Sequence, residues 1–228
     1  MIRPVTTLFL LTSVDGKIST GDTDAMDVDT DFPKINGVAQ GLYQYYALEQ
    51  ETDLCSFNTG RVMAKTGVND KKEPPEKIPV SFVILDNKPH LNASGVSYLC
   101  GRAEHLYLAT SNKNHPAVQM RKDNLTVLYD EKTDLKKLLR VLAQDYGVKR
   151  MTIQSGGTIN EAFLRQKLLD YVDIVVAPVL IGGRDTPSLI AGESLHNADE
   201  LERLSVLKLE KCDVLKESYV RLRYRVVG

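Results

Sequence analysis

Two adjacent glycines, Gly156 and Gly157, stand where the sequence could bind an anion. The segment 151–154 before them has the composition of a short strand, and the segment after them has the pattern of a helix. Thr158 and Glu161 have the spacing of a capping box, which predicts that this helix begins at Thr158. The free N–H groups of a first helical turn attract anions, and glycine lets a phosphate approach the backbone. An ordinary tight turn before a capped helix is the alternative.

Polar residues follow two further predicted strands. The segment 58–61 (NTGR) comes after a short apolar run, and Arg61 lies four residues before Lys65. If a helix begins here, both cations lie on one face and can pair with phosphates; a solvated basic turn is the alternative. The segment 86–88 (DNK) follows the next strand. Open α/β sheets bind ligands at the carboxyl ends of their strands, so three such strand ends favour a dinucleotide.

Several other functional patterns are missing from the sequence. It has neither the G-x-G-x-x-G fingerprint of Rossmann domains nor the G-x-S-x-G of hydrolases, and Ala64 rules out a P-loop at 60–66. The segment 21–31 holds five Asp residues but lacks EF-hand spacing, so a solvated loop is favoured over a calcium site. We expect no metal site, because four histidines show no ligand spacing: His90, His105, His115 and His196.

Length, charge and cysteine content exclude other classes of protein. The 228 residues include 29 Lys and Arg against 30 Asp and Glu, and a nucleic-acid-binding domain would need a basic excess. This length suits a single domain over residues 1–228 that needs no disulfide. Cys55, Cys100 and Cys212, an odd number, are expected to be reduced, mostly buried thiols in a cytoplasmic protein. The apolar run 5–11 ends at polar residues without a cleavage site, which favours a strand over a signal peptide.

The order of the predicted elements indicates the fold class. Apolar and β-branched runs predict strands at 5–11, 54–58, 80–85, 105–109, 125–128, 150–154 and 172–177. Helical periodicity predicts helices at 36–51, 134–147 and 158–168, the second capped by Asp134 and ended by Gly147. Two alternating runs joined near Glu217 predict a C-terminal antiparallel hairpin. The expected fold is α/β, with a mainly parallel sheet, helices on both faces and an antiparallel edge.

Four motifs, in order along nearly the whole chain, resemble one family. They are 12–18 (TSVDGKI), 83–87 (VILDN), 154–160 (QSGGTIN) and 171–183 (YVDIVVAPVLIGG). Together they resemble the pyrimidine reductases of riboflavin biosynthesis, the RibD C-terminal domain family, which share the dihydrofolate-reductase-like fold and use NADPH.

The resemblance implies a set of site residues. It implies that the cofactor pyrophosphate binds at Gly156, Gly157, Thr158 and Ile159. A second cofactor segment is implied at Thr59, Gly60, Arg61 and Lys65. It places Asn87 near the 2′-phosphate, the backbone of Leu11 beside the nicotinamide, and Asp15 near the substrate end. For the hydride transfer expected of such a reductase, the proton would come from Asp15 or from an ordered water. Because Lys88 adds a cation to Arg61 and Lys65, we expect NADPH to be preferred over NADH.

The substrate half departs from the family pattern. The family's glutamate that contacts the pyrimidine is replaced by Ser155, and the predicted helix at 37–51 has no Arg or Lys for a ribose phosphate. The leading hypothesis is therefore an NADPH-dependent reductase that transfers a hydride to a small heterocyclic, carbonyl or imine substrate. The alternatives are the genuine riboflavin-pathway reductase and a non-catalytic NADPH-binding protein. We expect poor turnover of 5-amino-6-(5-phosphoribosylamino)uracil, because each lost charge-assisted bond to the phosphate costs about 1.5 to 3 kcal/mol.

The predicted hairpin also suggests an oligomeric state. Tyr219, Arg221, Arg223 and Arg225 would share one face of its second strand, and Arg and Tyr are enriched at protein interfaces. A homodimer is therefore expected, with a charged edge that prevents aggregation as the alternative.

Overall fold

The computed structural model describes residues 2–73 and 75–227, and within it the chain forms two compact units. Residues 1–5 and 53–155 form the first unit, and residues 6–52 and 156–228 form the second. The ends of the predicted domain, Met1 and Gly228, lie outside the described residues, as does Pro74 of the loop after Asn69. The prediction of a single domain stays a prediction.

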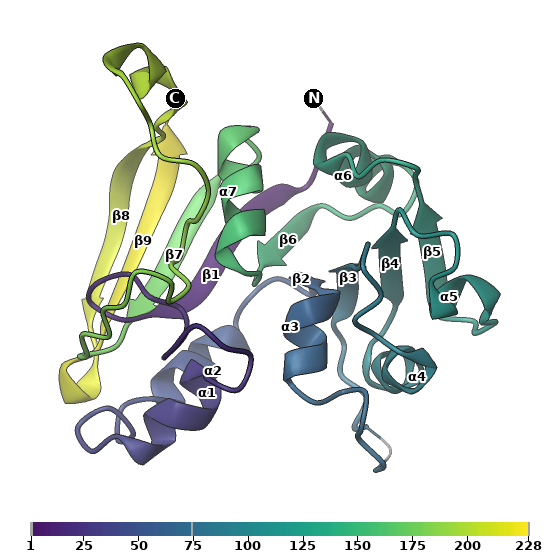
Figure 1. Cartoon of the computed structure of the whole chain (residues 1–228), viewed down its shortest axis with the longest axis horizontal. Helices are drawn as coiled ribbons and strands as arrows, with labels where there is room; N and C mark the ends of the chain where they lie inside the picture. The colour runs from purple at the N-terminus through teal and green to yellow at the C-terminus, as the bar shows by residue number, and fades with distance from the viewer. Residues whose placement is uncertain (1, 74, 228) are drawn as a thin grey trace. The chain divides into compact units, whose positions relative to one another are not determined.

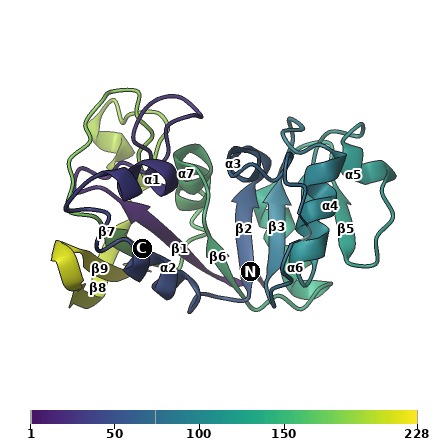
Figure 2. The same cartoon turned by 90° about the horizontal axis from the view of Figure 1, so that it is seen from below.

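The first unit contains five parallel strands in the order β5-β4-β3-β2-β6. Their common direction is clearest for β2 and β3 in Figure 2. The predicted strands are confirmed to within about two residues at each end. They are β2 (Cys55–Thr59), β3 (Ser81–Leu85), β4 (Leu106–Thr110), β5 (Leu125–Tyr129) and β6 (Arg150–Ile153).

Helices cover both faces of this five-stranded part (Figure 1). On one face, α4 (Ala93–Arg102) and α5 (Pro116–Gln119) pack through Leu99 and Ala117 against alternate residues of β3 and β4, such as Ile84. On the other face, α6 (Leu135–Gln144) faces Leu85 and its neighbours. The fourth helix, α3 (Gly60–Lys65), follows β2 directly. Helices α4 and α5 were not predicted from the sequence.

The second unit contains β1 (Val5–Thr12) and β7 (Tyr171–Val176) in parallel, followed by the antiparallel strands β9 (Val220–Val227) and β8 (Val206–Val214). Its helices are α1 (Val28–Asp31), α2 (Tyr43–Glu49) and α7 (Gly157–Arg165), with 3₁₀ turns at Phe32–Lys34, Ala198–Arg203 and Lys216–Ser218. Phe9 of β1 stacks on Tyr45 of α2 with ring centroids 5.2 Å apart, at the centre of the core on this face.

Three predicted boundaries in the second unit are wrong. The helix expected at 36–51 is turns up to Leu42 and a helix only from Tyr43 to Glu49. The segment 21–31, expected to be a loop, contains α1 with Asp27 as its N-cap. Helix α7 begins at Gly157 with Gly156 as N-cap, so Thr158 is not the capping residue and no side chain caps this end.

The C-terminal hairpin is confirmed, but the face that suggested a dimer is occupied within the chain. Tyr219 is fully buried in the core, and its hydroxyl donates to the carbonyl oxygen of Val38 at 2.8 Å. Arg221 and Arg223 both pair with the carboxylate of Asp173 on β7. These residues therefore stabilise the second unit itself. No helix of the described residues is long and apolar enough to span a membrane.

Candidate cofactor and substrate site

The carboxyl ends of the parallel strands in the first unit bring several predicted residues to one edge. Thr59 ends β2 and pairs in register with Leu85, which ends β3 and precedes Asp86 and Asn87. Ser155 follows β6, the other neighbour of β2. Two of the three polar strand ends predicted from the sequence therefore meet at one edge, as parallel strand order requires.

The turn into α3 is built as the sequence predicts. The hydroxyl of Thr59 accepts a hydrogen bond from the N–H of Val62 at 3.3 Å and caps the helix. Arg61, exposed, and Lys65, half-buried, follow in this helix at the predicted spacing of four. Gly60 is buried for a reason that the sequence does not show. A Cβ atom there would lie 2.1 Å from the Cγ of Asp86, so only glycine fits beside that carboxylate.

Asp86 is the most highly connected polar residue at this edge. Its side chain is completely buried and accepts hydrogen bonds from the backbone of His90 and Leu91. The rings of His90 and His115 contact its two oxygens at 3.0 and 3.1 Å. Burial acts to raise the pKa of Asp86, but these hydrogen bonds, led by that of His115, outweigh it and lower the pKa. Asp86 is therefore a carboxylate at neutral pH. The sequence analysis gave it no role of its own.

The side-chain amide of Asn87 is used in hydrogen bonds that hold this edge of the sheet together. Its Nδ2 donates to the hydroxyl of Thr133 at 2.6 Å, and its Oδ1 accepts from the N–H of Ser111 at 2.9 Å. The neighbouring Lys88 is exposed. Of the two residues predicted here, Lys88 has the freedom to follow a ligand, and Asn87 holds the ends of β3 and β4 to the start of α6.

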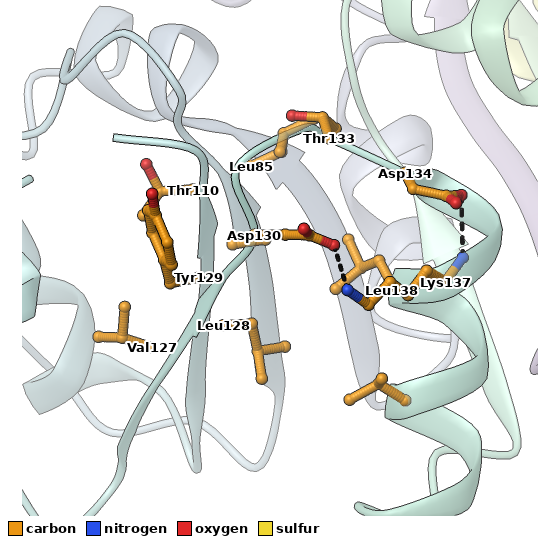
Figure 3. Close-up of a pocket in the computed structure, with 12 residues that line it drawn as sticks. Leu85, Thr110, Val127, Leu128, Tyr129, Asp130, Thr133, Asp134, Lys137 and Leu138 are labelled. Carbon is orange, nitrogen blue, oxygen red and sulfur yellow. Dashed lines mark hydrogen bonds and ion pairs between the residues drawn. The ribbon is translucent and has the colours of Figure 1, made fainter. Parts of the chain in front are cut away.

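A pocket of about 250 Å³ opens beside Thr133, between the ends of β3, β4 and β5 and the first turns of α6 (Figure 3). Its floor is apolar, with Leu85 and Leu138 among the lining residues. At the rim, the ammonium group of Lys137 pairs with Asp130 at 2.6 Å. The backbone N–H of Lys137 donates a hydrogen bond to the side chain of Asp134 at 3.0 Å. An apolar floor with an acidic rim suits a flat, uncharged ring better than a phosphate.

In the second unit, the N-cap Gly156 and the first helical residue Gly157 of α7 have different surroundings. A Cβ atom on Gly156 would meet nothing within 4 Å, so this residue leaves open space at the helix N-terminus. A Cβ atom on Gly157 would lie 2.3 Å from the carbonyl oxygen of Ser188, so Gly157 is required for packing. A side chain at Gly157 would therefore disturb the fold as well as the approach of a phosphate. Thr158 is exposed and Ile159 half-buried on the first turn.

Asp15 has a fixed position in a network of loops. Its carboxylate accepts from the hydroxyl of Ser13 at 2.6 Å and from the N–H groups of Ile181 and Gly182 at 3.1 and 2.7 Å. The hydrogen bond from Ser13, followed by those two, lowers the pKa of Asp15 to about 2. A carboxyl group with this pKa holds no proton at neutral pH. These hydrogen bonds favour a positioning role for Asp15, and its role as a proton source stays a prediction.

Lys17, in the same motif, holds the other end of that loop. Its ammonium group donates to the carbonyl oxygens of Gly183 and Thr186 at 2.7 and 2.9 Å. Arg184 lies between these two residues and is exposed. Arg184 and Lys34 are two cations of the second unit that could replace those missing from residues 37–51. Lys34 pairs with Asp31 at 2.9 Å, so Arg184 is the more available of the two.

Leu11 and Ser155 are buried. Leu11 pairs in register with Val175 on β7, and its side chain packs in the core, so only its backbone could border a cofactor. The three cysteines are free thiols, but Cys212 is exposed rather than buried. No cluster of metal-ligating side chains occurs in the part of the chain that the structure describes.

Known proteins resemble this chain in sequence. The family model of the RibD C-terminal domain matches residues 4–220. The chain is 26% identical, over its whole length and that of the relative, to the 2,5-diamino-6-ribosylamino-4(3H)-pyrimidinone 5′-phosphate reductase of Methanothermobacter thermautotrophicus. It is 24% identical to the protein of the same name from Archaeoglobus fulgidus, covering 89% of this chain and 93% of the relative.

Solved structures show the same fold. Acinetobacter baumannii RibD superposes with a TM-score of 0.69 at 18% identity, covering 99% of this chain and 59% of that one. The riboflavin biosynthesis reductase Rib7 of Saccharomyces cerevisiae superposes with a TM-score of 0.60 at 14% identity, covering 100% and 91%. The predicted α/β fold, with a mainly parallel sheet and an antiparallel edge, is confirmed, and so is the predicted class, a reductase. The chain belongs to the RibD C-terminal domain family.

Proposed function

We propose that this protein uses NADPH to reduce 2,5-diamino-6-ribosylamino-4(3H)-pyrimidinone 5′-phosphate in riboflavin biosynthesis. The observation that carries the proposal is the match to two reductases of that name, over the whole of one and 93% of the other. The structure supports it with an open helix N-terminus at Gly156 and with the strand-end turns of the first unit. NADPH supplies a hydride when bound, and with one proton this hydride converts a C=N bond of the opened sugar to CH–NH.

Each unit, taken by itself, offers groups that suit one part of a dinucleotide phosphate. The first turn of α7, from Gly157 to Ile159, offers N–H groups and the positive end of the helix dipole to the pyrophosphate. Arg61, Lys65 and Lys88 supply cations for the 2′-phosphate. The apolar pocket beside Thr133 takes the adenine ring, whose uncharged face suits its acidic rim.

We assign two residues to substrate binding, Ser155 and Arg184. In the first unit, Ser155 stands where the family has its pyrimidine-binding glutamate, and in the second unit Arg184 offers a cation for the 5′-phosphate on the loop that Asp15 and Lys17 hold in place. Asp15 does not transfer a proton, so the proton of the reaction comes from water or from the substrate. Arg184→Ala is expected to raise KM for the phosphorylated substrate at least tenfold, with kcat changed less.

The test is steady-state oxidation of NADPH by the purified protein with two substrates. We expect kcat/KM above about 10⁴ M⁻¹s⁻¹ with the diaminopyrimidinone, and at least about tenfold less with 5-amino-6-(5-phosphoribosylamino)uracil. Binding isotherms are expected to show weaker affinity for NADH than for NADPH. No oxidation with the diaminopyrimidinone would overturn the substrate assignment, and equal affinity for both cofactors would show that the cations do not contact a 2′-phosphate.

Two further proposals concern the whole protein. We place it in the cytoplasm, where its three free thiols would stay reduced. We also propose a homodimer, through a surface different from the arginine face first expected. The new surface, named here the apolar hairpin face, consists of Leu207, Leu209, Cys212 and Val214 of β8 with their partners Val220, Leu222, Tyr224 and Val226 of β9.

A further inference from the structure

Asp86 lies at the edge of the first unit where the parallel strands end, but its own side chain cannot contact a ligand. Its side chain is completely buried. A carboxylate accepts about four hydrogen bonds, and the backbone and ring of His90, the N–H of Leu91 and the ring of His115 supply four. All of its acceptor capacity is therefore used within the protein.

The hydrogen bonds of His115 fix which of its ring nitrogens carries the proton. Its Nδ1 accepts from the N–H of Ala117 at 3.1 Å and so caps α5. The other nitrogen, Nε2, then carries the proton and donates to Asp86. His115 is completely buried and joins the start of α5 to the end of β3 through one uncharged ring.

Asp86 also packs directly against the first residue of α3. The carboxyl atoms of Asp86 would lie 2.1 to 2.5 Å from a Cβ atom on Gly60, so the first residue of α3 rests directly on this side chain. The next residue, Asn87, reaches Ser111 and Thr133. Asp86 thus sits between the two turns that carry the proposed 2′-phosphate contacts.

We propose that Asp86, held by His115 and His90, is a positioning residue that sets the turn at Gly60–Arg61 against Asn87 for NADPH binding. This inference rests on the proposed function. As a positioning residue, Asp86 would strengthen NADPH binding. If it acted only through its charge it would weaken that binding, because a negative charge beside a phosphate site repels the phosphate. The two explanations therefore predict changes of opposite sign when the charge is removed.

The first test is Asp86→Asn, with NADPH affinity measured by titration. An amide nitrogen in place of one oxygen faces N–H donors and disrupts the network. We expect the Kd for NADPH and its KM to rise at least tenfold, with kcat at saturating NADPH within twofold of the wild type. Asp173→Asn is the matched control, because it removes a buried carboxylate from the second unit. It is expected to lower Tm and leave the Kd unchanged.

A second variant separates positioning from general stability. In His115→Asn the shorter side chain can still cap α5 but does not reach Asp86. We expect a folded protein whose NADPH affinity falls at least fivefold. In addition, Gly60→Ala is expected to weaken binding strongly when Asp86 is present and little in an Asp86→Ser background, where the added methyl group has room.

The outcomes distinguish this inference from the function on which it rests. Wild-type protein that binds no NADPH would overturn the proposed function and the inference with it. Wild-type protein that binds NADPH, together with Asp86→Asn and His115→Asn variants that bind it equally or more tightly, would overturn the inference alone. If Asp86→Asn does not fold, the result for His115→Asn decides.

Discussion

Asp15 shows how the surroundings of one residue limit its chemistry. Three hydrogen-bond donors hold its carboxylate, and they lower its pKa from 3.8 to about 2. Because the folded-state pKa is depressed, the contribution of Asp15 to stability is present above about pH 3.8 and is lost as pH falls through about 2. Between pH 5 and 9 the group does not titrate.

Asp15→Asn is therefore expected to leave the shape of the pH–rate profile unchanged over about pH 5 to 9. The amide can keep only part of the hydrogen bonding to Ile181 and Gly182, so KM for the substrate should rise as the loop loosens. The measurement is kcat and kcat/KM against pH for both proteins. A limb of the wild-type profile that disappears in the variant would restore Asp15 as the proton donor.

Gly156 and Gly157 offer a matched pair of substitutions with different expected effects. Gly157→Ala places its methyl group against the backbone of Ser188 and should destabilise the protein by about 1 to 3 kcal/mol. Gly156→Ala meets nothing within 4 Å and should leave Tm nearly unchanged while raising the Kd for NADPH about tenfold. Thermal unfolding and cofactor titration check both. Normal NADPH binding by Gly156→Ala would show that no phosphate approaches this residue.

At the scale of elements, the pairing of β7 with β9 depends on one buried carboxylate. Asp173 accepts two hydrogen bonds from Arg221, at 2.9 and 2.8 Å, and one from Arg223 at 3.1 Å. Hydrogen bonding to Asp173 is the main cause that raises the pKa of Arg221. Arg223 also lies 4.8 Å from the ring centroid of Tyr171. These contacts explain why an arginine-rich strand can lie next to β7.

Asp173→Asn is expected to lower the free energy of unfolding by about 3 kcal/mol, because it leaves two guanidinium groups without their carboxylate. This value is at the low end for buried pairs, since the arginine side chains keep 17% and 29% of their exposure. The control is Asp213→Asn on β8, whose pair with Lys211 is on the surface and should contribute less than about 1 kcal/mol. Equal effects in urea unfolding would contradict the assignment.

The elements that the sequence predicted well are those with a strong local pattern. β-Branched and apolar runs located the strands, and Asp134 marked the start of α6. Helix α4 was missed because Gly95 and Gly101 weaken its helix propensity, although Val96, Leu99 and Cys100 form its apolar stripe. The helix expected at 36–51 cannot begin at its predicted start, because Gly37 has a φ of +86°, outside the helical range.

The site was harder to predict because its contacts join distant residues. His115 reaches Asp86 from 29 positions away, and Gly157 meets Ser188, so neither relation appears in a local motif. The resemblance located the turns but not what holds them. Alternation placed Tyr219 on the arginine face, but it did not show that this face meets the core: Arg221 pairs in register with the buried Val175, and Tyr219 packs in the same core cluster as Val175.

At the scale of the whole molecule, the hairpin leaves an apolar surface uncovered. On the apolar hairpin face, Leu207, Leu209 and Val214 of the edge strand are 41%, 50% and 84% exposed. The opposite face of the same strands carries charged side chains, such as those of Lys208 and Arg225, which lie beside each other in register. An exposed, nine-residue edge strand with an apolar face is prone to association unless a partner covers it.

We therefore expect two copies to bury the apolar hairpin face against each other, with roughly 800 Å² covered on each copy as in a standard stable interface. Sedimentation velocity at micromolar concentration should give about twice the chain mass of 25.4 kDa. Leu209→Glu places a charge at the centre of this face and should produce monomers, whereas Lys208→Glu on the opposite face should leave the dimer intact. A wild-type protein that sediments at the mass of one chain would contradict the dimer. Dissociation by Lys208→Glu but not by Leu209→Glu would move the interface to the charged face.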